Sequence, residues 1–380
     1  MSPYESYRAE FPVVGEKAYL ISASLGPVSG RAKTELAEYV MAWAEMGAPE
    51  PVWFERIFPK MREVKELFGR LVGADADELA ITTNVSMALS TIASCMDFSG
   101  ERNRVVMTEL DFPTDAHVWR AQERLGAEVV LLPSADGLTV PTEAFAEAID
   151  ERTAIVCLNR VLYRSSGLLD VKEICRLARE AGAWSVVDDF HGAGIIPIDV
   201  HDVGCDFYTT GVLKWLCGGP GLTFLYARRD LIPSLEPTVT GWWGQRDPFG
   251  FGLDLDRHPT ARRLETGTHA APIAFIAHGG LQIIAEVTPE RIRERSTELT
   301  EYLMSRADEA GYPVRTPRDP KARGGVVNIG VGTDADKVSE ALYEEDVCVD
   351  SRMDGIRVSP HFFNTRADID RLFDGLREIL

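Results

Sequence analysis

Lys214 is the residue that first points to chemistry, because it lies inside the apolar run "GVLKWLCGGPG" (211–221). Burying an ammonium without a partner is costly, and that cost lowers the pKa of the amine and makes it a better nucleophile. The alternative is a lysine whose aliphatic stem packs on apolar surface while its ammonium reaches water. The chain has eight lysines against 32 arginines, which modestly favours a specific purpose for Lys214.

Two turns after short apolar runs carry residues suited to a phosphate and to an aromatic ring. In "LAITTNVSMALSTIAS", Asn84, Val85 and Ser86 stand where a helix begins. The free N–H groups of a helix start bind phosphate, although the same residue types are ordinary N-caps. In "VVMTELDFPTD", Phe112 follows a strand, where an aromatic side chain either stacks on a planar ring or packs in the core.

A third apolar run, "WSVVDDFHGAG", ends in Asp188, Asp189 and His191. An aspartate at such a strand end, aimed into a cleft, can pair with a protonated ring nitrogen. The alternative is an aspartate that caps a helix beside a solvated neighbour.

Alternating strand and helix patterns must position these residues. Between residues 65 and 255, apolar runs such as "NRVVMTEL", "EVVLLPS" and "AIVCLNR" alternate with amphipathic helical patterns. This predicts an α/β fold with a mostly parallel, doubly wound sheet, whose carboxyl strand ends face one ligand site. After residue 260, long helices and short strands predict a smaller α+β domain. We therefore expect a large domain over residues 21–258 and a small domain made of residues 1–20 and 259–380.

These parts have one economical explanation, pyridoxal phosphate. Its phosphate needs a helix N-terminus, its ring needs an aromatic face and a carboxylate at the pyridine nitrogen, and its aldehyde needs a lysine amine. Lys214 would tolerate apolar surroundings because its working form is an aldimine and not a free ammonium. Other cofactors fit less well. The chain has no GxGxxG opening a βαβ unit, no GxxxxGK[ST], and no HExxH or clustered His/Cys spacing for a metal.

The same residues lie in motifs that resemble the class V aminotransferase family of fold type I pyridoxal phosphate enzymes. This family includes kynureninase, cysteine desulfurase and isopenicillin N epimerase, and the resemblance covers nearly the whole chain. The motif "GIRVSPHFFNT" (355–365) is more similar to the desulfurase and epimerase side. The motifs most similar to kynureninase are "DFPTD" (111–115), "VLYRSSG" (161–167), "DDFHGAG" (188–194), "KWLCGGPG" (214–221), "GWWG" (241–244) and "ETGT" (265–268).

The resemblance implies which residues hold the outer parts of the cofactor. Val85 and Ser86 would bind its phosphate. Phe112 would stack on its ring, and Asp115 would lie close by.

The resemblance also implies three catalytic residues. Asp188 would pair with the pyridinium nitrogen and keep the ring an electron sink. His191 would lie near the ring and its 3′ oxygen. Lys214 would carry the internal aldimine and shuttle protons at the substrate Cα.

Four further residues are implied in binding the substrate and a second subunit. Arg357 would clamp the substrate α-carboxylate, a bidentate task that suits its planar fork, and Tyr163 would join it in binding the substrate. Trp242 and Thr268 would reach the phosphate of the neighbouring subunit, which implies a homodimer with shared active sites.

The chain departs from the family at positions that bear on specificity. Leu213 stands where kynureninases carry a tyrosine, Val212 where they carry a polar residue, and Leu162 where they carry an asparagine. Cys348 lies on a predicted strand, which favours a structural role over that of a desulfurase's loop cysteine. We expect a small L-amino acid to lose a proton to Lys214, giving a quinonoid, followed by β-carbon cleavage or elimination. The alternatives are an aminotransferase, an epimerase, a catalytically idle binding protein of the same fold, or a non-pyridoxal oxidoreductase.

Composition indicates which partners and which cell compartment to expect for this protein. The formal net charge of −19 and the absence of a basic patch argue against a nucleic-acid partner. The sequence contains no run of 18 uncharged apolar residues, so we expect no membrane span. The N-terminus is charged and lacks the apolar region of a signal peptide. Six scattered cysteines without a CxxC pair indicate reduced thiols, so we expect a cytoplasmic protein.

Overall fold

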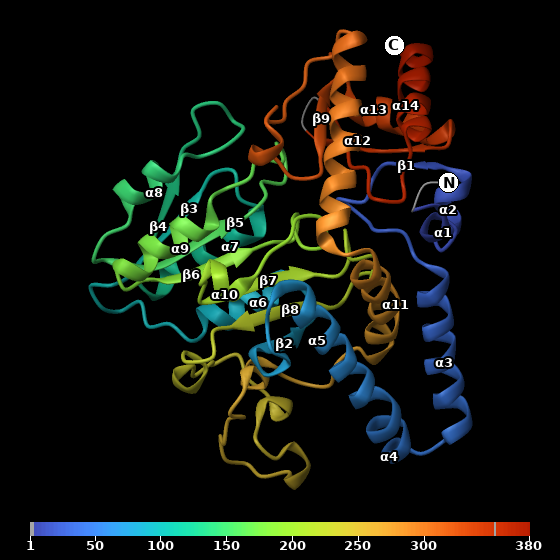
Figure 1. Ribbon diagram of the computed structural model, residues 1–380. Coiled ribbons are helices and arrows are strands. Elements are labelled where there is room, and N and C mark those ends of the chain that lie inside the picture. The colour runs from blue at the N-terminus through green and yellow to red at the C-terminus, as the bar shows by residue number, and fades with distance from the viewer. Residues whose placement is uncertain (1–3, 353–354) are drawn as a thin grey trace.

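A seven-stranded sheet organises the computed structural model, which describes residues 4–352 and 355–380 (Figure 1). The strand order is β2-β8-β7-β6-β5-β3-β4; the five strands from β7 to β4 run parallel, and β8 is antiparallel to both β7 and β2. The predicted mostly parallel sheet is therefore confirmed. Its strands are β2 (Leu79–Thr82), β3 (Arg104–Thr108), β4 (Glu128–Leu132), β5 (Thr153–Asn159), β6 (Trp184–Asp188), β7 (Phe207–Gly211) and β8 (Thr223–Ala227).

Helices cover both faces of this sheet, because its strands are apolar on both sides. Along β3, Val106 joins one apolar cluster while its neighbours Val105 and Met107 join another, as the two-residue period of a strand requires. One face packs against α5 (Phe58–Val72), α8 (Thr142–Ala148), α9 (Val171–Glu180) and α11 (Ala271–Val287). The other packs against α6 (Val85–Ala93) and α7 (Pro113–Arg120).

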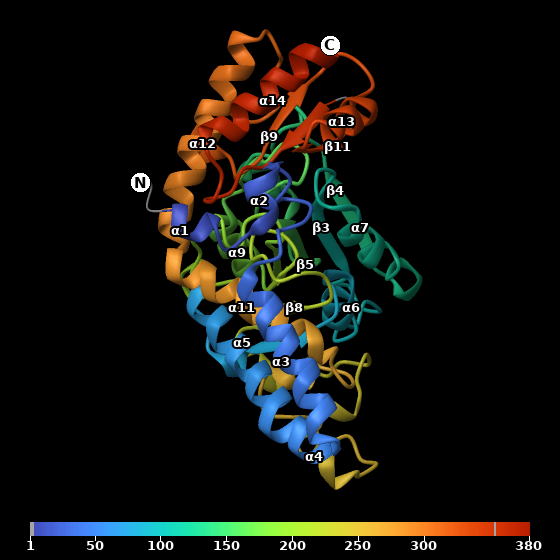
Figure 2. The same ribbon diagram turned by 90° about the vertical axis from the view of Figure 1, so that its right-hand side faces the viewer.

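Smaller sheets and the remaining helices complete the chain (Figure 2). A three-stranded antiparallel sheet has the order β11-β12-β9, with β9 (Val327–Gly330), β11 (Asp350–Arg352) and β12 (Gly355–Val358), and β1 (Ala18–Tyr19) pairs with β10 (Val347–Cys348). The other α-helices of the described residues are α1 (Glu5–Arg8), α2 (Pro12–Glu16), α3 (Gly30–Met46), α4 (Pro49–Pro51), α10 (Val200–Val203), α12 (Pro289–Glu309), α13 (Ala335–Glu344) and α14 (Arg366–Ile379).

The N-terminal segment packs with the C-terminal part of the chain. Arg8 forms a salt bridge with Asp368 at 2.8 Å, and β1 adds to β10. Helix α11 instead lies against α3 and α5 beside the large sheet. The division of domains at residue 258 stays a prediction. No single helix among the described residues is long and apolar enough to cross a membrane, and only the bent pair α11–α12, taken together, meets that criterion.

The carboxyl ends of the parallel strands bring the site residues together. Asn159 ends β5 and lies in register with Asp188, which ends β6. Lys214 follows the end of β7, in a turn where Gly219 and Gly221 have φ angles of +74° and +108° that favour glycine.

Candidate active site

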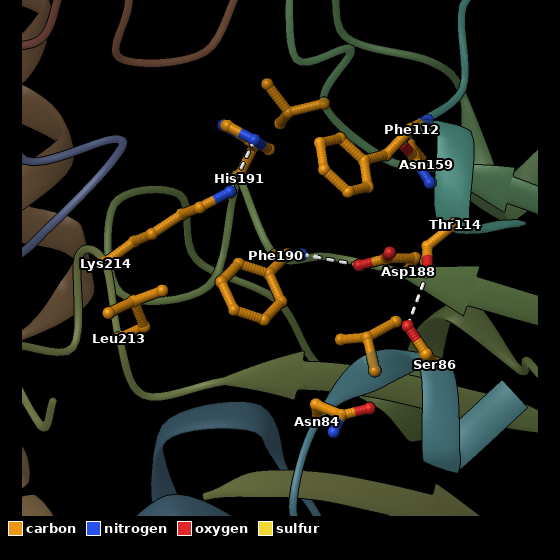
Figure 3. A pocket seen from close by; sticks show the side chains of 12 residues that line it. Asn84, Ser86, Phe112, Thr114, Asn159, Asp188, Phe190, His191, Leu213 and Lys214 are labelled. Atoms are coloured by element: carbon orange, nitrogen blue, oxygen red, sulfur yellow. Dashed lines mark hydrogen bonds between the residues drawn. The ribbon is translucent and has the colours of Figure 1, made fainter. Parts of the chain in front are cut away.

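A cavity of about 240 Å³ opens at the carboxyl ends of β5, β6 and β7 (Figure 3). Most of the residues predicted to bind a cofactor line it, and they come from strand ends and helix starts far apart in the sequence. The lining residues are Asn84, Val85, Ser86, Phe112, Thr114, Asn159, Val161, Asp188, Phe190, His191, Leu213 and Lys214.

Lys214 points into this cavity and contacts His191. Its Nζ lies 2.6 Å from His191 Nε2. Burial and, after it, the positive charge of Arg357 lower the pKa of Lys214 to about 7, against the opposing effect of Asp188. Burial and the charge of Lys214 hold the pKa of His191 well below its ordinary value, so the imidazole is neutral and its Nε2 can accept a hydrogen bond from the lysine amine.

Asp188 lies across the cavity from Lys214. This residue is 3% exposed, and its Oδ1 accepts a hydrogen bond of 2.9 Å from the Phe190 N–H. Burial raises the pKa of this carboxyl above its ordinary value, and the charge of Lys214 partly offsets that effect. A carboxylate that is this poorly solvated pairs strongly with a cation brought to it.

Two aromatic rings flank the space between these charges. Lys214 Nζ lies 4.4 Å from the ring centre of Phe190 and 5.9 Å from that of Phe112. Phe112 in turn makes an edge contact with Tyr163, with ring centres 5.2 Å apart. Figure 3 shows Lys214 extending toward the space between the rings of Phe112 and Phe190. A planar ligand in this space would meet an aromatic surface on each side.

The N-terminus of α6 forms another wall of the cavity. Asn84 caps the helix, because its side chain accepts a 2.9 Å hydrogen bond from the Met87 N–H. The Ser86 and Thr114 hydroxyls, from the first turns of α6 and α7, lie 2.5 Å apart. Two hydroxyls beside a helix start are suited to an anion such as phosphate.

Asp115 lies behind the cavity wall and does not line it. Its Oδ2 accepts a hydrogen bond from the Asn159 amide, whose Oδ1 accepts one of 2.8 Å from the Phe112 N–H. Its other oxygen is buried and has no hydrogen-bond partner among the described residues. Burial and the neighbouring Asp188 raise the pKa of Asp115 well above its ordinary value. Asn159 therefore connects the carboxyl of Asp115 to the backbone that carries Phe112.

Arg357 is buried on β12 and is already paired. Its Nε and Nη2 donate to the two carboxylate oxygens of Asp350 at 2.9 and 2.7 Å. Its Nη1 donates to the Tyr163 carbonyl at 2.9 Å. The Tyr163 ring centre is 6.4 Å from that of His191, which places Arg357 next to the cavity through Tyr163.

Trp242 and Thr268 do not line the Lys214 cavity. They line a separate cavity of about 170 Å³ with the aromatic side chains of Trp53, Phe58, Trp243 and Phe249. The fully buried Glu265 supports this region, because it binds Lys65 at 2.6 Å and His269 at 2.8 Å.

Several residues that line the cavity were not predicted from the sequence. Phe190 stands inside the "DDFHGAG" motif, yet nothing in the sequence shows which way its ring points. Thr114 and Asn159 could have been found, since one follows Phe112 in "DFPTD" and the other ends a strand. Leu213 lines the cavity, whereas Val212 and Leu162 belong to the apolar core and do not line it.

Comparisons with known proteins identify the family of this chain. The aminotransferase class-V family profile matches residues 38–372. The uncharacterized aminotransferase YcbU of Bacillus subtilis is 31% identical, with 97% of this chain and 96% of that protein aligned. Kynureninase of Geobacillus thermodenitrificans is 29% identical over 94% of this chain and 87% of its own. Isopenicillin N epimerase of Streptomyces clavuligerus is 30% identical, covering 83% of each chain.

Solved structures show the same fold. The apo structure of cysteine desulfurase from Thermococcus onnurineus superposes with a TM-score of 0.89 at 21% identity, covering 100% of this chain and 98% of that one. A complex of the cystine C-S lyase C-DES with cysteine persulfide gives 0.88 at 20% identity, over 96% and 98% of the two chains. The resemblance predicted from the motifs is thus confirmed, and the chain belongs to the class-V aminotransferases, a family of pyridoxal-phosphate-dependent enzymes.

Proposed function

We propose that this enzyme binds pyridoxal phosphate at Lys214 and acts on a small L-amino acid. The observation that carries this proposal is the placement of Lys214 and Asp188 on two sides of one cavity flanked by aromatic rings. The pKa of Lys214 is lowered to about 7, so a large share of the amine is unprotonated near neutral pH and can attack an aldehyde.

The residues present fit each part of the cofactor. Asn84, Val85 and Ser86 would hold the phosphate at the N-terminus of α6, where the helix supplies free N–H groups. Phe112 would lie against the pyridine ring. Asp188 would keep the ring nitrogen protonated, because a buried carboxylate gains most from a nearby cation.

Two residues of this chain would take part in removing the substrate Cα proton. When bound, pyridoxal phosphate supplies an electron sink for the bonds at the substrate Cα. Lys214 would take the Cα proton, since its lowered pKa matches a general base working near neutral pH. His191, held neutral and in contact with Lys214 Nζ, would orient the amine through a hydrogen bond.

For the fate of the substrate we propose cleavage or elimination at the β-carbon. The kynureninase-like motifs and the kynureninases among the relatives support this choice. The alternatives in the same site are transamination and epimerisation, supported by relatives named aminotransferase and isopenicillin N epimerase. Leu213 and Val161 give the cavity an apolar side, which favours an uncharged substrate side chain.

A panel of L-amino acids tests this proposal. Purified protein is titrated with each amino acid while the cofactor absorbance is followed, and products are then separated by chiral chromatography and mass spectrometry. Release of a fragment from the β-carbon supports the proposal, whereas a 2-oxo acid or a D-amino acid supports transamination or epimerisation. Lys214→Ala is the control, and it should give none of these products.

We also propose a homodimer whose subunits complete each other's sites. Trp242 and Thr268 lie outside the Lys214 cavity of their own chain, so they are free to serve a second copy. The segment around Trp242 exposes large apolar side chains, with Trp242 41%, Phe251 76% and Leu253 100% exposed. Side chains of this kind gathered on one surface mark an interaction site.

A further inference from the structure

Asp350, Arg352 and Arg357 form a charged cluster beside the active site. β11 and β12 are antiparallel neighbours, and Asp350 lies directly opposite Arg357. Arg352 is two residues along β11 from Asp350, so both side chains leave the strand on the same face. The cluster therefore holds two guanidinium groups and one carboxylate.

Most N–H donors of the Arg357 guanidinium are already engaged in hydrogen bonds. A guanidinium has five N–H donors. Asp350 takes one from Nε and one from Nη2, Ser24 Oγ takes another from Nη2 at 2.5 Å, and the Tyr163 carbonyl takes one from Nη1. A bidentate bond to a substrate carboxylate needs two N–H donors on one edge, so it requires that an existing partner leave.

Of the groups bound to Arg357, the Asp350 carboxylate is the one that can move to another cation. The Tyr163 carbonyl is fixed in the backbone, whereas Asp350 Oδ2 already lies 3.4 Å from Arg352 Nη2. Arg352 is more exposed than Arg357, with side-chain exposures of 39% and 2%. If the Asp350 carboxylate moves toward Arg352, it exchanges one guanidinium partner for another. Its negative charge is then not left buried without a counter-charge.

The cluster also adjoins the cavity. Ser24, which donates to Asp350 and accepts from Arg357, lies on a segment whose Gly26 N–H bonds to the Leu213 carbonyl at 2.8 Å. Leu213 lines the cavity next to Lys214. A ligand held at Lys214 is therefore close to the guanidinium that Asp350 occupies.

We infer that Asp350 is a displaceable stand-in for the substrate carboxylate and sets the enzyme's selectivity for carboxylates. In the free site it neutralises Arg357. An incoming α-carboxylate takes over Arg357, and Asp350 pairs with Arg352, so the cluster goes from one excess positive charge to none. An uncharged group in place of the carboxylate cannot make this exchange. The inference rests on the proposed function, because it assumes that Arg357 receives the substrate.

Two variants separate displacement from simple positioning. Asp350→Asn removes the competing charge, and Arg352→Gln removes the group that receives Asp350. The holoenzyme is titrated with L-alanine and with L-alaninamide, which lacks the carboxylate, and the dissociation constants come from the change in cofactor absorbance.

We expect Asp350→Asn to bind L-alanine about tenfold more tightly and Arg352→Gln about tenfold more weakly, each the effect of one charged hydrogen bond. Binding of L-alaninamide should change little in either variant. If Asp350 only positions Arg357, Asp350→Asn will bind L-alanine more weakly and Arg352→Gln will bind like wild type. That pattern, or equal affinity for both probes in the wild-type enzyme, would overturn the inference.

The experiment also distinguishes this inference from the proposed function. Absence of any Lys214-dependent cofactor absorbance would contradict the proposed function itself. Normal absorbance with the wrong order of affinities would contradict only the displacement of Asp350. If Asp350→Asn does not fold, the weaker binding expected of Arg352→Gln still decides the question, because that variant keeps the Asp350–Arg357 pair.

Discussion

Lys214 Nζ lies 2.6 Å from Nε2 of His191, a histidine whose imidazole is neutral because burial and nearby positive charges lower its pKa. This contact gives the lysine a hydrogen-bond partner without giving it a counter-charge. Asp188, on the other side of the cavity, opposes the lowering of the Lys214 pKa but does not cancel it. The hydrogen bond to His191 orients the lysine, and its lowered pKa keeps the amine reactive.

Attachment of the cofactor to Lys214 should speed up as the pH rises and level off above about 7, because only the unprotonated amine attacks an aldehyde and the pKa of Lys214 is lowered to about 7. An ordinary lysine with a pKa of 10.5 would keep speeding up across this range without levelling off. The measurement is the rate of borohydride-trapped attachment between about pH 5 and pH 9, read by peptide mass spectrometry. The exposed Lys337 serves as the internal control for labelling of a surface amine, and labelling of Lys337 equal to that of Lys214 would refute the assignment.

Asp188→Asn should retain the cofactor but lose turnover by roughly 100-fold or more, because the buried charge expected to keep the ring nitrogen protonated is gone. The isosteric amide preserves the size of the side chain. Bound cofactor is quantified after denaturation, and turnover is measured with the best amino acid of the panel. Turnover close to that of wild type would show that Asp188 has no electrostatic role.

Phe190→Ala should weaken cofactor binding by up to about tenfold, since aromatic contacts of this kind contribute roughly 0.5–1.5 kcal/mol. The ring of Phe190 lies near Lys214 Nζ and fills space against Gly211. Phe112→Ala, on the opposite wall, is the matched comparison and should act in the same direction. The dissociation constants follow from fluorescence titration of protein freed of cofactor. Unchanged binding in Phe190→Ala would place its ring outside the cofactor's contacts.

Glu265→Gln should destabilise the fold by about 3–5 kcal/mol, because it leaves the ammonium of Lys65 without its buried counter-charge. The charge of Lys65 and the hydrogen bond from His269 overcome burial and hold the pKa of Glu265 below its ordinary value of 4.5. The stability it adds is therefore present at neutral pH and is lost only in acid.

Urea unfolding monitored by tryptophan fluorescence measures this effect. Glu66→Gln, which breaks the exposed pair with Arg62, is the control and should leave the free energy of unfolding nearly unchanged. Similar losses in both variants would mean that the Glu265 network contributes no more than a surface pair.

Shared active sites predict that two defective subunits can rescue each other. Lys214→Ala and Thr268→Ala chains, refolded together, should form hybrid dimers in which one site carries neither defect. Random pairing then leaves about a quarter of all sites intact. Activity at limiting cofactor should exceed the average of the two parent variants. Activity equal to that average would mean that Thr268 serves its own chain or no site at all.

The sequence predicts well the sheet and which residues meet at its edge, because both depend on local patterns. Buried parallel strands give continuous apolar runs, and residues at their carboxyl ends must meet, as Asn159 and Asp188 do. Lys214, Asp188, His191 and Phe112 line one cavity for this reason.

Contacts between side chains that are far apart in the chain could not be predicted from the sequence. The motif "GIRVSPH" marks Arg357, but nothing in it shows that Asp350 occupies the guanidinium, since that depends on the register of β11 and β12. Asp115 belongs to a motif with Phe112, yet its position one helical turn into α7 turns the carboxyl behind the wall. The apolar Val212 and Leu162 turned out to pack in the core and do not shape the cavity.

The most direct test of the central claim is to compare purified wild-type protein with Lys214→Ala after both are incubated with pyridoxal phosphate, treated with borohydride and digested. The account predicts a phosphopyridoxyl group on the peptide that contains Lys214 in wild type, a visible absorbance band before reduction, and neither in the variant. Equal labelling of surface lysines in both proteins, with no band in either, would contradict the account.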